Sequence, residues 1–138
     1  MKLWASAFVV CVLAGTACGD SNSTPDFVQP TPTLVTDSFN GTVAVGGADF
    51  HNFAVTTAGA VNVTLTAAGP PSTIYMGLGV GTPSASTCAL LTGGQTATPA
   101  GTTAQLSGTI AAGSYCVSVF DVGNQTGSIT YAVTVTHY

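Results

Sequence analysis

Positive charge is almost absent from this chain. Its 138 residues include a single lysine or arginine, Lys2, and no glutamate, so that charged residues make up 4% of the total, against an average of about 25%. Nucleic-acid binding and attachment to anionic lipid headgroups both depend on clustered Lys and Arg side chains. The composition therefore excludes both kinds of binding, and we expect no nucleic-acid partner.

This shortage of charge does not indicate disorder. Disordered chains combine low hydrophobicity with high net charge, whereas here 46% of the residues are hydrophobic and the mean hydropathy is +0.49. The surface must instead consist of neutral Thr, Ser, Asn, Gln, Gly and Ala. The composition predicts one small folded domain with a neutral polar surface.

The N-terminus has the pattern of a signal peptide. Lys2 is followed by an apolar run over residues 3–14 and then by small residues. This run is too short for a transmembrane helix, which needs about 20 apolar residues. We predict a signal peptide over residues 1–17 and an exported protein.

A lipid anchor is predicted at Cys18. The stretch that ends at this cysteine, Leu-Ala-Gly-Thr-Ala-Cys, resembles a bacterial lipobox, which implies a membrane-anchored lipoprotein facing the periplasm or the cell exterior. Gly15 stands where a leucine is usual, and Gly15 with Ala17 also fits ordinary signal-peptidase cleavage, so secretion is the alternative. The polar, proline-punctuated residues 18–36 read as a flexible tether.

The cysteines divide between the leader and the domain. Cys11 lies in the apolar leader and Cys18 is the lipid acceptor, which leaves Cys88 and Cys116. Export compartments are oxidising and favour a disulfide between these two. A metal site would need CxxC spacing and nearby histidines, and a reactive thiol would need a neighbouring basic group; neither feature is present.

Residues 37–138 show the period of two that is typical of β-strands. Apolar and small polar residues alternate in short runs separated by Gly, Pro and Asn turns, and no helical period is found. About eight short strands are predicted, which indicates an all-β antiparallel β-sandwich with a jelly-roll or Ig-like outline. Residues 81–102 are the least regular, and here we expect one short strand near 88–91 followed by a loop.

The domain resembles the bacterial pre-peptidase C-terminal (PPC) domain. The resemblance rests on four segments in the family's order: residues 46–55, 61–65, 112–119 and 127–135. It implies a jelly-roll sandwich that serves secreted proteases as an accessory module for secretion, solubility or substrate attachment. This chain departs from the family's outline because it carries no protease and lacks the acid cluster with which some relatives bind calcium.

No catalytic residue, cofactor or metal site is predicted. His51 lies two residues from Asp49, which would suit acid–base or metal chemistry, but one histidine without a convergent partner is more simply an aromatic at the edge of the core. His137 is expected to be exposed near the C-terminus. No GxSxG nucleophile elbow is found. A calcium site built from backbone oxygens is left as an alternative.

A loop at one end of the sandwich is the candidate ligand site. Asp121 and Asn124 belong to a turn in which such side chains bond their own backbone, and loops of this kind also carry ligands. Phe50 and Phe120 are expected to face outward near turns, as are Tyr75 and Tyr138. Exposed rings of this sort can stack on sugars, and the alternative is that the two phenylalanine rings pack under a loop.

These observations predict a non-enzymatic cell-envelope lipoprotein with a PPC-like module for adhesion, binding or accessory functions. Its expected partners are the membrane, through the N-terminal lipid, and a glycan or an envelope protein. The alternative is a structural subunit of a surface layer or filament, because strand edges without charged residues favour self-association.

Overall fold

Eight strands make up the domain. The computed structural model describes residues 28–138. Its strands are β1 (Val35–Val43), β2 (Ala48–Val55), β3 (Gly59–Gly69), β4 (Met76–Ser84), β5 (Thr87–Thr98), β6 (Leu106–Ile110), β7 (Gly113–Phe120) and β8 (Ile129–His137). Within these described residues, no helix is long and apolar enough to cross a membrane.

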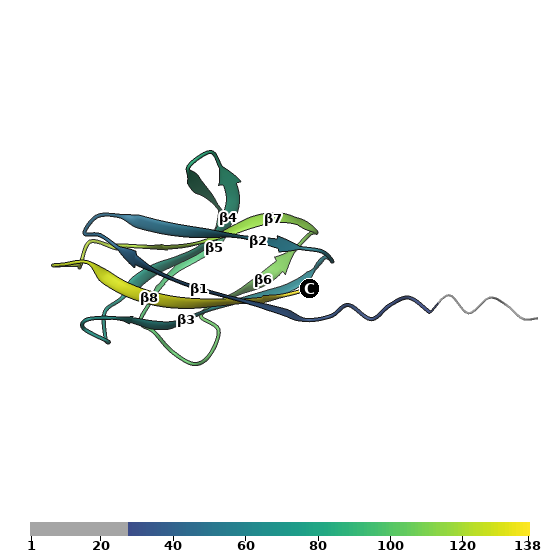
Figure 1. Cartoon of the computed structure of the whole chain (residues 1–138), viewed down its shortest axis with the longest axis horizontal. Helices are drawn as coiled ribbons and strands as arrows, with labels where there is room; N and C mark the ends of the chain where they lie inside the picture. Colours follow the sequence, from purple (N-terminus) through teal and green to yellow (C-terminus); the bar gives the residue numbers. More distant parts are fainter. Residues whose placement is uncertain (1–27) are drawn as a thin grey trace, which may run out of the picture. The chain divides into compact units, whose positions relative to one another are not determined.

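The strands form two four-stranded antiparallel sheets packed as a sandwich (Figure 1). One sheet has the order β1-β8-β3-β6 and the other β2-β7-β4-β5. Successive strands alternate between the sheets, except that β4 and β5 form a hairpin within one sheet. This is the strand order of a jelly roll, so the predicted all-β sandwich is confirmed and its outline is jelly-roll rather than Ig-like.

The core lies between the sheets, on the inward rows that the alternation predicts. Successive side chains on a strand point to opposite faces, and burial alternates along β3 and β8. In the central strands β4 and β7, residues 76–81 and 116–119 are buried on both faces. The largest buried side chains include Leu65, Met76, Leu78, Val117 and Val133. Each fully buried aliphatic side chain of this kind contributes about 1.5–3 kcal/mol to folding.

The outer face of the β1-β8-β3-β6 sheet is a neutral hydroxyl surface. The pairing register places Thr36 beside Thr136, Thr136 beside Asn62, and Asn62 beside Ser107, in one row across all four strands. The next row continues with Ser38, Thr134 and Thr64. Neither row contains a charged residue, in keeping with the surface that the composition predicts.

The prediction for residues 81–102 was wrong in part. β5 runs without interruption over twelve residues, Thr87–Thr98, instead of ending near Leu91 in a loop. Its pairing with β4 jumps from Gly81↔Leu90 to Gly79↔Gln95, so residues 91–94 form a bulge. This bulge breaks the period of two, although the backbone continues to pair on either side of it.

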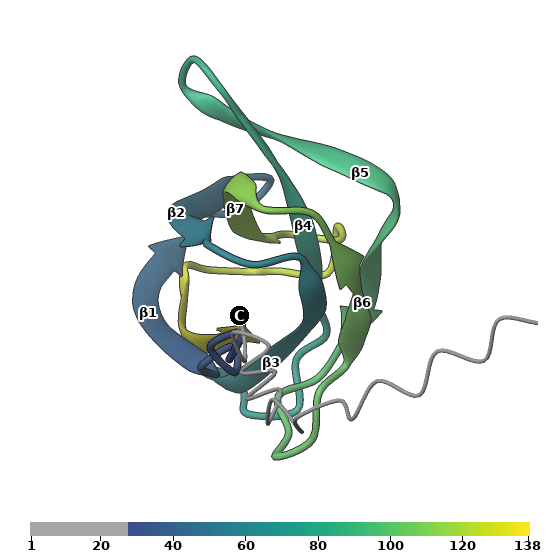
Figure 2. The ribbon, with the colours of Figure 1, turned by 90° about the vertical axis from the view of Figure 1, so that its right-hand side faces the viewer.

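The disulfide between Cys88 and Cys116 is present, with the Cα atoms 5.9 Å apart. Cys116 is fully buried but lies outside the hydrophobic core cluster, on the outer side of β7, as its place in the alternation predicts. The bond connects β5 to β7 across β4, because the strand order places β4 between them. Figure 2 shows the β4–β5 hairpin projecting beyond the sandwich.

Glycines on the outer row of β4 leave room for residues of the neighbouring strands. A Cβ on Gly81 would lie 2.3 Å from the Ala89 carbonyl oxygen, and one on Gly77 would lie 2.1 Å from the Phe120 ring. A Cβ on Gly79 would lie 2.7 Å from Leu90. Only glycine permits β5 and Phe120 to approach β4 so closely, which explains why this row carries no side chains.

Candidate functional site

Asp121, which was predicted to belong to a ligand-binding loop, connects two turns through hydrogen bonds. Its carboxylate accepts the backbone N–H of Gly46 at 2.7 Å and that of Gly123 at 2.8 Å, with longer bonds from Asn124 and Gln125. The Gly46 bond, more than the others, holds the pKa of Asp121 below its usual value. With its carboxylate oxygens engaged in this way, Asp121 joins the β7–β8 loop to the β1–β2 turn.

The other predicted loop residues lie at the same end of the β2-β7-β4-β5 sheet. Phe50 pairs with Ser118 and Ala48 with Phe120, so the register makes the two rings diagonal neighbours on the outer face. Both rings are partly buried rather than exposed, and Phe120 lies against Gly77. Asn124 donates its side-chain amide to the Tyr75 carbonyl. The structure therefore gathers these residues, but it uses them mainly for packing and for loop bonds.

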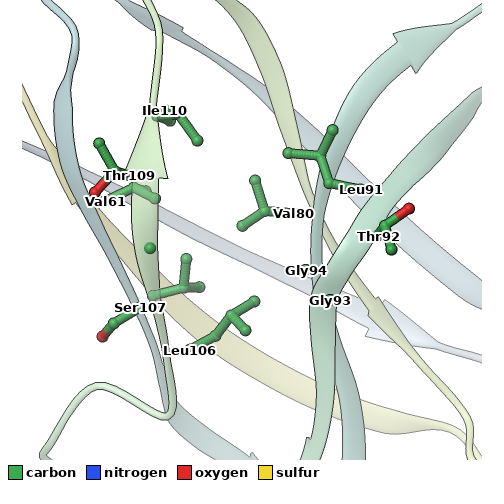
Figure 3. Close-up of a pocket in the computed structure, with 12 residues that line it drawn as sticks. Val61, Val80, Leu91, Thr92, Gly93, Gly94, Leu106, Ser107, Thr109 and Ile110 are labelled. Carbon is green, nitrogen blue, oxygen red and sulfur yellow. The ribbon is translucent and has the colours of Figure 1, made fainter.

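An apolar cleft that the sequence did not reveal lies between β5 and β6. It has a volume of about 150 Å³ and opens to solvent. Val80 of β4, Leu91 of β5, and Leu106 and Ile110 of β6 point toward one another into it (Figure 3). Val61 and Val63 of β3, both part of the core cluster, complete its apolar lining.

The bulge in β5 creates this cleft. Residues 91–94 leave the pairing with β4, and Gly93 has a φ of +74°, in the left-handed region that favours glycine. Gly94 lies so close to the Val80 carbonyl that a Cβ there would come within 2.9 Å of it. The backbone of β5 is thus diverted from the regular path of the sheet beside β6, and the diversion leaves Leu91 37% exposed at the mouth of the cleft.

The rim of the cleft is polar but uncharged. Gly93, Gly94 and Gly108 leave backbone accessible there. The hydroxyl groups of Thr92, Ser107 and Thr109 border the cleft but point away from it (Figure 3), and that of Ser107 donates to Asn62 on the outer face of the sheet. A Cβ placed on Gly108 would meet no atom within 4 Å, so the middle of β6 borders open space. No titratable side chain lines the cleft, which suits the site to binding rather than to acid–base chemistry.

His51 belongs to a hydrogen-bonded cluster on the opposite flank of the sandwich. Tyr131 donates its hydroxyl to Asp49 at 2.8 Å, and the His51 Nε2 lies 3.0 Å from the same hydroxyl. The imidazole stacks on Phe39 with ring centroids 4.8 Å apart. Burial, followed by the bond to Asp49, raises the pKa of Tyr131 above its usual value. The hydroxyl therefore stays protonated, which makes it a structural donor and a poor nucleophile.

His137 was predicted to be exposed, and this prediction was wrong. Its residue is 2% exposed, and its Nε2 lies 3.0 Å from an oxygen of Asp37. The cause is the alternation of β8, which continues to its last residue and turns His137 inward behind Val135. The buried ring also lies 5.3 Å from that of Phe53.

Metal-binding groups of three or more His, Cys, Asp or Glu side chains are not found among residues 28–138. The residues predicted to form a signal peptide, and Cys18, the predicted lipid acceptor, lie outside the described residues, so the structure does not bear on either prediction.

Comparison with known proteins adds a likeness of fold. No protein-family model and no curated protein match the chain. Among solved structures, the chain is similar to PliG of Aeromonas hydrophila, a periplasmic lysozyme inhibitor of g-type lysozyme. The two share 16% sequence identity with a TM-score of 0.48, over 78% of this chain and 90% of that one. A likeness at this level concerns the sandwich fold and carries no information about what this chain binds.

Proposed function

We propose that this protein is a non-enzymatic binding module of the bacterial cell envelope, exported and anchored through a lipid on Cys18. The observation that carries the proposal is the cleft between β5 and β6. It is open to solvent and apolar inside, and its rim consists of uncharged residues with accessible backbone. Such a site recognises an apolar group of a partner by burying it, with few polar groups to fix orientation.

Binding rather than catalysis is supported by the positions of the titratable side chains. Asp121 braces two turns, Asp49 and His51 share the hydroxyl of Tyr131, and Asp37 pairs with His137. None of these groups lines the cleft. A general base must lie within hydrogen-bond reach of its substrate, and the described residues offer no such group there.

Export and anchoring are supported by the leader and by the disulfide. The apolar run over residues 3–14 and the lipobox-like stretch before Cys18 suit a lipoprotein. The bond between Cys88 and Cys116 suits an oxidising compartment. The PPC-like character belongs to this proposal as well, because the jelly-roll order agrees with what that resemblance implies.

The anchor is tested by expressing the full chain in a bacterium fed radiolabelled palmitate. We expect label in the mature protein and none in a Cys18→Ser variant. Unlabelled protein in the medium, beginning at Cys18, would favour secretion and contradict the anchor.

The binding site is tested by retention on envelope fractions with two matched variants. Gly108 and Gly127 both border open space, since a Cβ on either would meet no atom within 4 Å. Gly108→Leu should fill the cleft and lower retention about tenfold, whereas Gly127→Leu should leave retention unchanged. Equal retention of both variants would show that the cleft is not the binding site.

A structural subunit of a surface layer or filament is the second candidate function. It is favoured by the neutral outer face of the β1-β8-β3-β6 sheet and by the uncharged edge strand β6, because charged edge residues normally block edge-to-edge pairing. Electron microscopy of the purified protein tests it, since ordered polymers would favour the structural function over the binding module.

A further inference from the structure

The backbone of β6 has a free edge beside the cleft. β6 is the end strand of its sheet and, among the described residues, pairs with β3 alone. Its other side faces β5, with which it forms no ladder, and the two strands lie at the same flank of the sandwich (Figure 2). The amide and carbonyl groups on that side are therefore available to an added strand.

The cleft lies where an added strand would place its inward side chains. A strand beside β6 continues the β1-β8-β3-β6 sheet, and every second side chain would then point between the sheets. The space there is bordered by Leu91, Leu106 and Ile110. Its volume of about 150 Å³ suits one aliphatic side chain, since an apolar cavity of that size accommodates a group as large as benzene.

The opposite flank offers no equivalent site. There β1 and β2 are the edge strands, and the space between them holds Phe39 stacked on His51, together with the carboxylates of Asp37 and Asp49. Each of these carboxylates is 34% exposed. Inward-pointing charges at an edge disfavour pairing with another strand. The two flanks thus differ, and within residues 28–138 only the β5–β6 flank combines a free edge with an empty apolar space.

The residues that line the cleft indicate which class of ligand it can bind. A glycan would be expected to stack on aromatic rings, and no aromatic side chain lines the cleft. A charged partner would find no countercharge, because the lining contains only apolar residues, glycines, serine and threonines. The free backbone of β6 instead matches the neutral backbone of an extended polypeptide.

We propose that the β5–β6 flank binds an extended, uncharged polypeptide segment of a partner protein, which adds a strand to β6 and places one aliphatic side chain in the cleft. Main-chain hydrogen bonds would supply affinity and the cleft would supply specificity. This proposal rests on the proposed binding function and names the class of partner that the cleft receives.

The test uses a heptapeptide, acetylated and amidated at its ends, with a central leucine flanked by threonines and serines. It is titrated into the ¹⁵N-labelled protein and followed by NMR. We expect shift changes confined to β6, residues 91–94 and their neighbours, with protection of β6 amides from exchange. A peptide with aspartate in place of the leucine should bind about tenfold more weakly.

An N-methylated version of the same peptide tests the strand itself. Methylation of alternate amides removes backbone donors but keeps every side chain, so binding should weaken about tenfold if the segment pairs with β6. Equal affinity of the methylated peptide would overturn strand addition while leaving the cleft as a binding site.

The variants used for the envelope fractions separate the remaining outcomes. Gly108→Leu should abolish peptide binding and Gly127→Leu should preserve it, with the spectra reporting that both variants are folded. Should Gly108→Leu lose its fold, Leu91→Arg at the mouth of the cleft serves the same purpose.

Unchanged peptide binding by whichever of these two variants is folded would show that the cleft is not the site, and would refute the proposed function with it. A different result would overturn the polypeptide partner alone. In that case neither this peptide nor other neutral peptides with a central leucine would bind, while retention on envelope fractions would still depend on Gly108.

Discussion

Asp121 accepts a hydrogen bond from the backbone N–H of Gly46 at 2.7 Å, across a separation of 75 residues in the chain. The same carboxylate accepts N–H groups of its own loop, from Gly123, Asn124 and Gln125. One side chain therefore organises both the β7–β8 loop and its junction with the β1–β2 turn. Because it holds two segments of the chain together, Asp121 is a natural target for mutation.

Replacement of Asp121 by Asn should lower the midpoint of thermal unfolding at neutral pH and have little effect in strong acid. Because hydrogen bonds hold its pKa below the usual value in the folded state, the carboxylate stabilises the fold above the unfolded pKa of about 3.9. That contribution is lost as the pH falls through the lower folded pKa. Thermal unfolding of both proteins between neutral and strongly acidic pH measures this; parallel curves would contradict it.

Replacement of Gly77 by Ala should destabilise the domain by about 1–3 kcal/mol, the usual cost of overpacking. A Cβ at this position would lie 2.1 Å from the ring of Phe120, so the ring must move. Gly127→Ala is the control, because no atom lies within 4 Å of the Cβ it adds. Urea unfolding provides the free energies, and adding Phe120→Ala should remove most of the penalty at Gly77. A penalty that persists without the ring would locate the strain elsewhere.

The strands and the core were predictable because both follow from a local pattern. On β8, Ile129, Tyr131, Val133 and Val135 alternate with small polar residues, and the structure buries all four. Such a pattern needs no knowledge of which strands become neighbours. The burial of His137 follows from the same alternation one step further on, which nearness to the terminus does not interrupt.

The cleft was not predictable, because it depends on how distant segments meet. β5 and β6 lie at one flank only as a result of the jelly-roll order, and the empty space arises from the bulge at residues 91–94. One local signal was present. Gly93 and Gly94 are adjacent inside β5, and glycine in a strand interior often marks a bulge. The two glycines indicate where the strand is irregular, although not what the bulge would face.

Replacement of Asp37 by Ala should destabilise the domain by about 1–3 kcal/mol. The Nε2 of His137 lies 3.0 Å from the Asp37 carboxylate, and the buried ring would be left with an unsatisfied polar atom. Because Asp37 is itself partly exposed, water can replace part of the lost bond, which favours the lower end of this range. Ser38→Ala, at the neighbouring outward-facing position of β1, is the matched control. Equal stability of the two variants in urea would show that water fully replaces the hydrogen bond between Asp37 and His137.

Replacement of Tyr131 by Phe should cost about 1 kcal/mol at neutral pH, since it removes the hydroxyl that connects Asp49 with His51. This cost should shrink at alkaline pH. Burial raises the pKa of Tyr131 in the folded state above the usual value of about 10. The folded protein therefore holds this proton when the unfolded chain has released it, and stability falls as the pH rises above about 10. The Phe variant has no hydroxyl at this position and does not lose stability in this way, so the stabilities of the two proteins should converge with rising pH.

Urea unfolding at a series of alkaline pH values measures the convergence, and tyrosinate absorbance of the native protein should show one phenol that resists titration. A constant difference between the proteins, or normal titration of every phenol, would contradict the buried hydrogen-bonded hydroxyl.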